Sequence, residues 1–373
     1  MMRARPLSAL VAAAAAFSAV RALAQTTMDA QAGAEYRSVT YGAGLGYSAL
    51  KEFAVPFGIA MPVGQRLNLD AGTYYVSAQR TDASGSQQTI NGLTDLIVRG
   101  AYQLKPDVAV FTFAVSLPTG KKTLSSEQRQ VASVMATDLV PFPVTNFGTG
   151  FSVTTGLAWA TPVGPWALGL AGSFRYNASY LPSSDSLQDT VTLRPGAEMR
   201  FRIGADRIIG QGRLSLGVTY SSFANDEFGS QSQSPGTRLI PQFSWSAPFG
   251  ANNSLVFYGW DVYRNVDETA SSNAGVKQNT VALGAMASLH SGTRNALRPQ
   301  LEVRHGWQGP GGLKNAGTLV GLGLRYSMAT GERMTLTPGL RLDLGSLATN
   351  NASGPASANV TGLSFSITAR TSF

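Results

Sequence analysis

Arginine recurs at alternate positions in several stretches of the chain whose other positions are largely apolar. In 297–308, Arg298 and Arg304 alternate with Leu297, Leu301 and Val303. A planar guanidinium group binds carboxylate or phosphate through two parallel hydrogen bonds, and rings of arginine favour anions in a pore. The alternation predicts a common face for Arg99, Arg175, Arg194, Arg200, Arg202, Arg238, Arg298, Arg304, Arg325, Arg341 and Arg370.

Acidic residues predicted on the same face are fewer, namely Asp95, Glu198, Glu302 and Asp343. Asp95 is expected to pair with Arg99 or with another arginine. Two interpretations of the face remain open. The excess of arginine favours a path that attracts anions, because low-dielectric walls focus the field of fixed charges. Alternatively, the charged residues pair with one another and form a packed interior that conducts poorly.

Residues suited to catalysis are scarce. The only histidines are His290 and His305, and neither has a serine and an orienting acid at a spacing that forms a triad. We expect His305 on the opposite, apolar face beside Trp307, and His290 at a short turn. No group of residues has metal-ligand spacing, and no phosphate-binding loop is present. The sequence therefore predicts no catalytic residue, no metal, no cofactor and no enzyme activity.

The arginines must be positioned by β-strands, because only a strand places every second residue on the same face. The last stretch, 361–373, alternates throughout and ends on Phe373. Similar stretches of about ten residues, long enough to cross a bilayer as tilted strands, recur along the chain. They predict an all-β fold of 16 strands, with 14 as the fallback: 37–48, 51–61, 66–79, 90–104, 107–117, 147–161, 165–180, 190–203, 211–223, 236–247, 253–264, 277–289, 297–308, 316–328, 333–344 and 360–373.

Composition narrows the class of protein. Charged residues make up 13% of the chain and cysteine is absent, which argues against a disordered tail, a nucleic-acid-binding arm and a disulfide framework. Residues 1–24 resemble a secretory signal peptide, with a membrane anchor as the alternative. No later stretch has the 18 or so apolar residues that a membrane helix needs. Residues 25–373 are therefore expected to form a single transmembrane antiparallel up-and-down β-barrel rather than a soluble sandwich.

The expected connections alternate between short turns and long loops, as in barrels with periplasmic turns and external loops. The longest is the external loop 118–146. Within it, 125–139 predicts a helix capped by Ser125 or Ser126. One side of that helix would carry Val131, Val134, Met135 and Leu139. The helix could fold into the barrel as a constriction or lie across its outer rim, and an irregular loop is the third possibility.

The first and last strands are expected to pair and close the barrel, so that neither remains an exposed edge. Phe373 would then lie at the periplasmic rim, in the aromatic girdle. A terminal Phe after alternating residues also resembles the C-terminal signature that bacterial outer-membrane proteins present to the barrel-assembly machinery.

Three short stretches carry a resemblance to a family. They are Asn91-Gly92-Leu93-Thr94-Asp95-Leu96, Val115-Ser116-Leu117-Pro118-Thr119-Gly120-Lys121 and Asn146-Phe147-Gly148-Thr149-Gly150. They resemble the Ser-Gly-Leu-Gly-Asp, Leu-Pro-Thr-Gly and Gly-Ser-Gly landmarks of the phenol-degradation MetA-pathway, transporter-like outer-membrane family, with Asn91 in place of Ser and Thr94 in place of Gly. The resemblance covers mainly 50–150 and implies an outer-membrane channel associated with uptake of aromatic or apolar compounds. From the residues alone, Gly92 and Gly120 are expected to permit turns with positive φ at strand ends.

Together these patterns predict a passive channel for small solutes in the bacterial outer membrane, with an arginine-rich lumen and with aromatic or anionic compounds as candidate solutes. The alternative is a non-enzymatic surface or structural barrel with a closed lumen. Expected partners are outer-membrane lipid, the barrel-assembly machinery and a small-molecule solute, but no nucleic acid. The sequence leaves the oligomeric state open.

Overall fold

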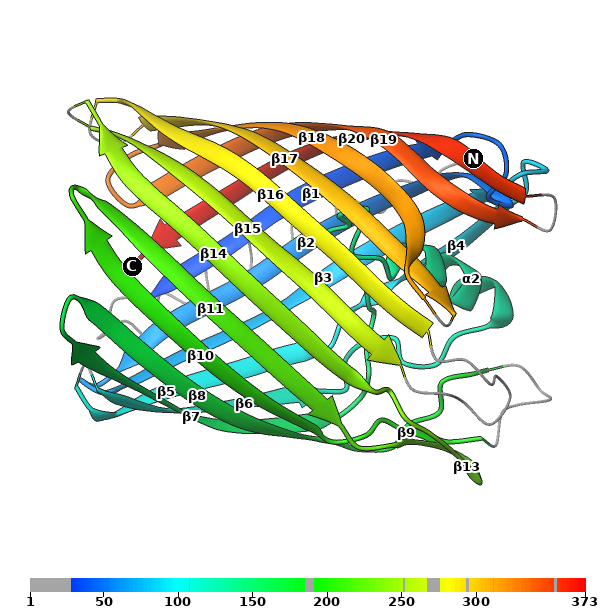
Figure 1. The fold of residues 1–373 in the computed structure, drawn as a ribbon, viewed down its shortest axis with the longest axis horizontal. Coiled ribbons are helices and arrows are strands. Elements are labelled where there is room, and N and C mark those ends of the chain that lie inside the picture. Colours follow the sequence, from blue (N-terminus) through cyan, green and yellow to red (C-terminus); the bar gives the residue numbers. More distant parts are fainter. Residues whose placement is uncertain are drawn as a thin grey trace.

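The computed structural model describes residues 28–106, 108–184, 191–250, 252–266, 276–292, 295–310, 312–351 and 354–373. The expected signal peptide, 1–24, lies outside the described residues. The described chain forms a closed antiparallel β-barrel whose strands run obliquely to its long axis (Figure 1). This architecture confirms the predicted fold class.

The barrel wall has 16 strand positions. The main sheet contains 17 strands, but β4 and β5 are consecutive parts of one position, because β4 pairs with one half of β3 and β5 with the other. Around the wall the strands are β1 (Asp29–Tyr41), β2 (Tyr47–Val63), β3 (Leu67–Asp82), β4 (Gln87–Leu93), β5 (Leu96–Lys105), β6 (Ala109–Leu117), β7 (Ser152–Val163), β8 (Trp166–Asn177), β10 (Glu198–Ile209), β11 (Gly212–Phe223), β14 (Thr237–Phe249), β15 (Asn253–Val266), β16 (Val276–Ser291), β17 (Asn295–Pro310), β18 (Lys314–Ala329), β19 (Met334–Asn351) and β20 (Gly354–Ser372).

The last strand closes the barrel against the first, as expected. In this antiparallel pair Asp29 lies opposite Ser372 and Tyr41 lies opposite Val360. Beyond the strands, the Phe373 N–H donates to the Met28 carbonyl oxygen at 2.9 Å. Neither terminal strand is therefore an open edge that could pair with another chain.

The first strand differs from its predicted position, since it spans Asp29–Tyr41 rather than 37–48. Gly44 and Gly46 adopt φ values of 108° and 68°, which few other residues tolerate, and they turn the chain after Tyr41. Small residues on both faces of 29–34 weaken the alternation there, so the start of the strand left little signal in the sequence.

Two later boundaries also differ. The expected strand 190–203 begins only at Glu198 as β10, because residues 193–194 form β9 (Leu193–Arg194) in a small separate sheet with β12 (Asp226–Phe228) and β13 (Gln231–Gln233). The expected loop 345–359 is largely a strand hairpin, because β19 continues to Asn351 and β20 begins at Gly354.

The two faces of the wall differ in chemistry. Ile203, Leu301 and Phe365 are 64%, 46% and 51% exposed on the outer face, whereas their polar strand neighbours face inward. A closed barrel with an apolar outer surface meets the requirement of a hydrocarbon environment that every backbone group be paired. In the described part of the chain, no helix has the length and apolar character needed to cross a membrane.

The two ends of the barrel also differ (Figure 1). Short turns such as 64–66, 164–165 and 210–211 lie at one end, together with the C-terminus, and we call it the turn end. The longer connections and the helix α2 (Ser126–Met135) lie at the other, which we call the loop end.

The longest connection, 118–151, folds back against the inner face of the wall at the loop end. Its helix α2 begins after Ser125, whose side chain accepts the Gln128 N–H in a capping box, so the expected helix and its cap are confirmed, but the helix ends at Met135 and does not extend to 139. Val131 and Met135 on α2 are fully buried, and they belong to an apolar cluster with inward-facing residues of the wall, among them Val39, Leu50, Val76, Ile90, Leu319 and Val360. The segment after the helix, 137–150, reaches deeper into the barrel.

Met135→Ala is expected to loosen this connection. Truncation of a fully buried Met leaves a cavity and costs about 2–5 kcal/mol. Hydrogen exchange of α2 should therefore become faster, while exchange of the barrel strands should be unchanged. Val134→Ala is the control, because Val134 is only partly buried against the cluster. Equal exchange in α2 of both variants would contradict the proposed anchoring by Met135.

Candidate functional site

Most of the predicted arginines lie on wall strands and point into the barrel. Their positions alternate with exposed apolar residues, as those of Arg200 and Arg202 do with Phe201. The inward set is Arg99, Arg175, Arg200, Arg202, Arg238, Arg298, Arg304, Arg325, Arg341 and Arg370. The prediction for Arg194 is wrong. It lies in β9 of the small separate sheet, where it pairs with Glu227 at 3.6 Å.

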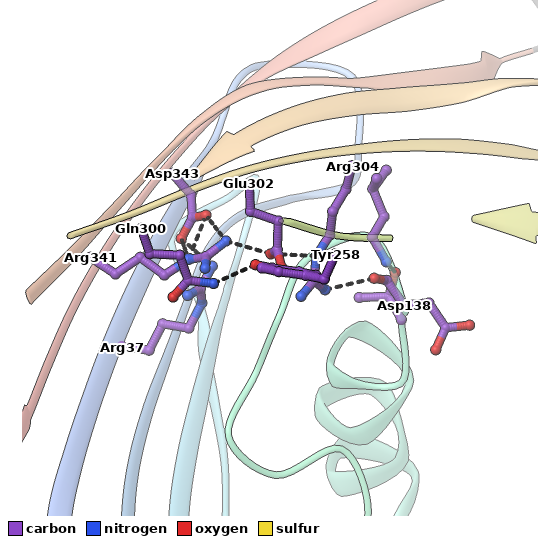
Figure 2. Close-up of polar contacts among 10 residues, drawn as sticks. Arg37, Asp138, Tyr258, Gln300, Glu302, Arg304, Arg341 and Asp343 are labelled. Atoms are coloured by element: carbon purple, nitrogen blue, oxygen red, sulfur yellow. Dashed lines mark hydrogen bonds and ion pairs between the residues drawn. The ribbon is translucent and has the colours of Figure 1, made fainter. Parts of the chain in front are cut away.

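A chain of alternating charges crosses the inner wall from β17 through β19 to β1 (Figure 2). Glu302 accepts hydrogen bonds from Arg304 and Arg341, each at 2.9 Å. Arg341 and Arg37 both pair with Asp343, each at 2.9 Å. We call these five residues the charge ladder. It holds three arginines and two acids, so its net charge is +1 (3 − 2).

The ladder is shielded from solvent to different degrees along its length. Asp343 and Arg37 are 0% and 2% exposed, and Glu302 is 4% exposed. The Glu302 carboxylate also accepts a hydrogen bond from the Tyr258 hydroxyl at 2.9 Å (Figure 2). Arg304 lies with its guanidinium over the Trp260 ring, 5.2 Å from the centroid. Both acids therefore have several hydrogen-bond donors as neighbours. Arg304 and Arg341 are partly exposed, so their positive charge acts on the lumen.

A second arginine cluster lies on the opposite part of the wall, on β10 and β14. Glu198 accepts hydrogen bonds from Arg200 and Arg238, each at 2.8 Å, which leaves one positive charge in excess. Two inward arginines have exposed acid partners, because Arg99 pairs with Asp70 at 2.6 Å and Arg370 with Asp29 at 2.7 Å. Three others donate to hydroxyls: Arg175 to Ser152, Arg202 to Thr219 and Arg298 to Ser327.

Residues 137–150 of the long connection cross the barrel interior. Asp138 pairs with Arg264 on β15, and its carbonyl oxygen accepts a hydrogen bond from Arg304 at 2.9 Å. The Val144 N–H donates to the carboxylate of Glu52 on β2 at 2.9 Å. These contacts tie one segment to strands that are far apart around the wall, so it narrows the lumen.

Cavities remain on both sides of this segment. One of about 610 Å³ lies between Pro143 and the wall that carries Arg175 and Arg200. Another, of about 320 Å³, lies between Phe142 and the ladder, and Arg325 also lines it. A larger cavity of about 990 Å³ is lined by residues of β7, β8, β10, β11, β14 and β15, including Arg202.

The three family-like motifs meet at Asp95, which is 6% exposed. Its carboxylate accepts backbone N–H groups from Gly120 at 2.9 Å, Thr149 at 2.8 Å and Gly150 at 3.1 Å. We call this arrangement the Asp95 clasp. A Cβ atom on Gly120 would lie 2.7 Å from the Asp95 Oδ1, and one on Gly148 would lie 2.9 Å from it. Glycine is needed at both positions because the backbone approaches the carboxylate so closely.

Other motif residues join the loop to the break between β4 and β5. The Thr119 hydroxyl donates to the Thr94 carbonyl oxygen at 3.1 Å and accepts the Leu96 N–H at 2.8 Å. The Lys121 N–H donates to the Leu93 carbonyl oxygen at 3.1 Å. Of the remaining motif residues, Asn91 and Gly92 lie in β4, Leu117 ends β6 and Pro118 follows it. The motifs therefore hold the start of the loop at one place on the wall.

Two expectations about these residues are wrong. Asp95 does not pair with Arg99, because its oxygens face backbone N–H groups while Arg99 pairs with Asp70. Gly120 is not among the glycines with positive φ, and close contact explains it better than a turn does. The short sequence distance between Asp95 and Arg99 could not reveal the loop that comes between them in space.

Two buried charged residues, Arg37 and Glu52, are not among the predicted site residues. Glu52 is 0% exposed and lies beneath the loop. Arg37 stacks 5.4 Å from the centroid of the Phe142 ring on the same loop. The available signal was Glu35 and Arg37 at alternate positions, but the boundary predicted for the first strand separated them.

The histidines lie apart from the ladder. His305 is on the outer face of β17, with its Nδ1 2.7 Å from the Thr318 hydroxyl and its ring centroid 4.2 Å from that of Trp307. His290 lies at the end of β16, where its N–H donates to Asn253 at 2.9 Å. Among the described residues, no group of three or more His, Cys, Asp or Glu side chains could hold a metal ion.

Comparisons with known proteins concern the fold. No family model matches the chain, and no curated protein matches it. OprB of Pseudomonas putida is similar with a TM-score of 0.50 and 13% identity, over 95% of this chain and 96% of that one. An anion-selective porin from Comamonas acidovorans has a TM-score of 0.43 and 14% identity, over 94% and 99% of the two chains. The CymD monoaromatic hydrocarbon channel has a TM-score of 0.42 and 11% identity, over 94% and 89%. Together with the closed wall, the likeness to OprB shows that this chain has the fold of an outer-membrane β-barrel.

Proposed function

We propose that the chain is a passive outer-membrane channel for small solutes and that its lumen favours anions. The observation that carries the proposal is positive charge without local compensation inside a closed wall. Arg175, Arg202 and Arg298 donate to hydroxyls, which do not cancel their charge. Low-dielectric walls focus such a field and raise the local concentration of anions.

The cavities supply a route past the loop. The 610 Å³ cavity beside the loop shares Arg99, Ala114 and Thr154 with a further cavity of about 480 Å³. That second cavity also reaches Asp29 at the start of β1, near the turn end. A small solute could therefore move along the inner face of β5–β7.

The alternative function is a surface or structural barrel with a closed lumen. The apolar cluster around α2 favours it, because it fills the loop end along β1–β4, β18 and β20. A filled lumen stiffens the barrel but leaves little room for solutes. The two functions differ in conductance, which makes them separable by one measurement.

Location and partners follow from the same proposal. The apolar outer face would contact outer-membrane lipid, and the C-terminal strand with Phe373 would be recognised by the barrel-assembly machinery. The long loops would be external and the short turns periplasmic. Membership in the MetA-pathway family would explain why its three motifs meet in the Asp95 clasp, and it favours aromatic or apolar solutes. The proposed function is transport rather than catalysis: among the described contacts, His305 meets Thr318 and the His290 N–H donates to Asn253, and neither contact is that of a triad.

The test is the single-channel current of the refolded barrel in a planar bilayer, with a potassium chloride gradient to give the reversal potential. We expect steady conductance and a reversal potential on the anion-selective side. Arg202→Gln should shift the reversal potential toward that of potassium, because it removes a charge that lines the 990 Å³ cavity. Absence of conductance in protein shown to be folded by heat-dependent gel mobility would favour the closed barrel. A cation-selective current would contradict anion preference.

A further inference from the structure

The 610 Å³ cavity beside the loop has the size of a small-molecule site, for which about 300–1,000 Å³ is typical. Strands β5–β8 and β10 form one wall of it, and residues 143–149 of the loop form the other. It thus lies where the lumen is narrowed, and a solute moving along this side of the barrel must enter it.

Among the three described arginines that line this cavity, Arg175 is the one without an acid partner, because Arg99 pairs with Asp70 and Arg200 with Glu198. One terminal nitrogen donates to the Ser152 hydroxyl at 3.2 Å, whereas its buried Nε has no partner. Among the described residues, no carboxylate lies within ion-pair distance of Arg175. The terminal nitrogens of Arg175 carry further N–H groups, and an entering carboxylate could accept two of them in a two-pronged contact.

The charges around the cavity favour a single anion. Arg175 contributes +1, and Arg200 with Arg238 exceeds Glu198 by +1. Asp95 contributes −1, and Arg99 is balanced by Asp70, so the sum is +1 (1 + 1 − 1 + 0). A ligand with one negative charge would neutralise this site, whereas a dianion would leave an excess.

The rest of the lining suits an apolar body. Ile97 is 43% exposed although it faces the barrel interior, and Ala114 and Pro143 lie on the same cavity. Tyr74 also lines it. Contact with these side chains would remove apolar surface of a ligand from water.

We propose that this cavity is a binding subsite for a small monocarboxylate with an apolar or aromatic body, with its carboxylate on Arg175 and its body against Ile97 and Pro143. The proposal rests on the channel function, because it names the class of solute that the lumen would select. A neutral solute of the same shape lacks the group that Arg175 binds.

The experiment is isothermal titration calorimetry of the folded barrel in detergent, with benzoate as the probe and benzamide as its neutral counterpart. We expect saturable benzoate binding and no saturable benzamide binding. Arg175→Gln should weaken benzoate binding by about tenfold or more, which is the loss expected for a charge-assisted two-pronged contact. The control is Arg207→Gln, because Arg207 lies over the Trp166 ring and outside this cavity, and it should change affinity by less than about twofold.

Several results would overturn the subsite. Benzoate could bind Arg175→Gln as tightly as the unchanged chain, or benzamide could bind as tightly as benzoate. Heat-dependent gel mobility shows that each variant is folded. Arg175→Lys keeps the positive charge but cannot donate two parallel hydrogen bonds to one carboxylate, so it should bind benzoate with intermediate affinity. Anion-selective conductance without saturable benzoate binding would refute the subsite and leave the channel. Binding that depends on Arg175 without conductance would refute the channel and leave a ligand-binding barrel.

Discussion

Asp95→Ala is expected to release the loop from the wall and to raise the single-channel conductance. The substitution leaves the N–H groups of Gly120, Thr149 and Gly150 without their acceptor. Each unsatisfied buried donor costs about 1–3 kcal/mol, so the anchoring free energy should fall by about 3 kcal/mol or more. The loop would then visit positions outside the lumen, and the current should become larger and noisier. Hydrogen exchange of 118–151 measures the release directly.

A graded variant and a control sharpen this test. Asp95→Asn keeps one carbonyl oxygen, so it can satisfy Thr149 and Gly150 while its amide faces the Gly120 N–H. Its effect should be smaller than that of alanine but in the same direction. Asp70→Ala removes an exposed ion pair with Arg99, worth about 1 kcal/mol or less, and should leave loop exchange unchanged. Unchanged exchange in Asp95→Ala would contradict a clasp.

The barrel wall was open to prediction because its signal is local. Along a wall strand, side chains alternate between the outer surface and the lumen. The alternation of apolar and polar residues therefore predicts both that a segment is a strand and which of its residues face the lumen. The prediction failed where this contrast is weak, as in 29–34, where small residues serve both faces. It also failed at Arg194, where alternation continues although the chain has left the wall for the small sheet.

For the candidate site, the sequence predicts which side chains face inward but not which of them contact one another. Parity indicates that Glu302 and Arg341 face inward, but not that they meet across 39 positions of the chain. Which arginine keeps an acid and which keeps only a hydroxyl depends on the register between neighbouring strands. The path of the loop depends on contacts with Glu52 on β2 and with Asp95 in the break between β4 and β5. These are long-range pairings, and a single sequence carries no local pattern for them.

The loop that narrows the lumen makes apolar contacts on one side and polar contacts on the other. On the side of α2 the loop packs by burial of apolar surface, which tolerates small shifts of side chains. On the side of the ladder it meets fixed charges, with Arg304 donating to the Asp138 carbonyl oxygen and Arg37 stacked on Phe142. The apolar cluster and the Asp95 clasp both hold the loop in place, and the charge ladder determines the field that a solute meets beside it.

Asp343→Asn is expected to destabilise the barrel more than any exposed charge change. Asp343 is 0% exposed, and it is the acid partner of Arg37, which is 2% exposed. Loss of one member of a buried ion pair leaves an uncompensated charge and costs about 3–5 kcal/mol. The Ser364 hydroxyl, which accepts from Arg37 at 2.9 Å, offers no charge in return. The free energy of unfolding in urea, measured in lipid vesicles, gives the loss.

The double variant Arg37→Met with Asp343→Asn distinguishes two causes of the stability loss in Asp343→Asn. One is the lost attraction between Arg37 and Asp343, and the other is the unpaired charge of Arg37 in the barrel wall. If the cost arises because Arg37 is left unpaired in a dry site, removal of that arginine should recover much of the stability lost in Asp343→Asn. Asp29→Asn is the matched control, because its pair with Arg370 is exposed and should change stability by about 1 kcal/mol or less. A double variant that is less stable than Asp343→Asn alone would show that Arg37 stabilises the wall through its other contacts. In that case Arg37 would stabilise the barrel mainly by packing against Phe142, and the charges of the ladder would affect solutes more than stability.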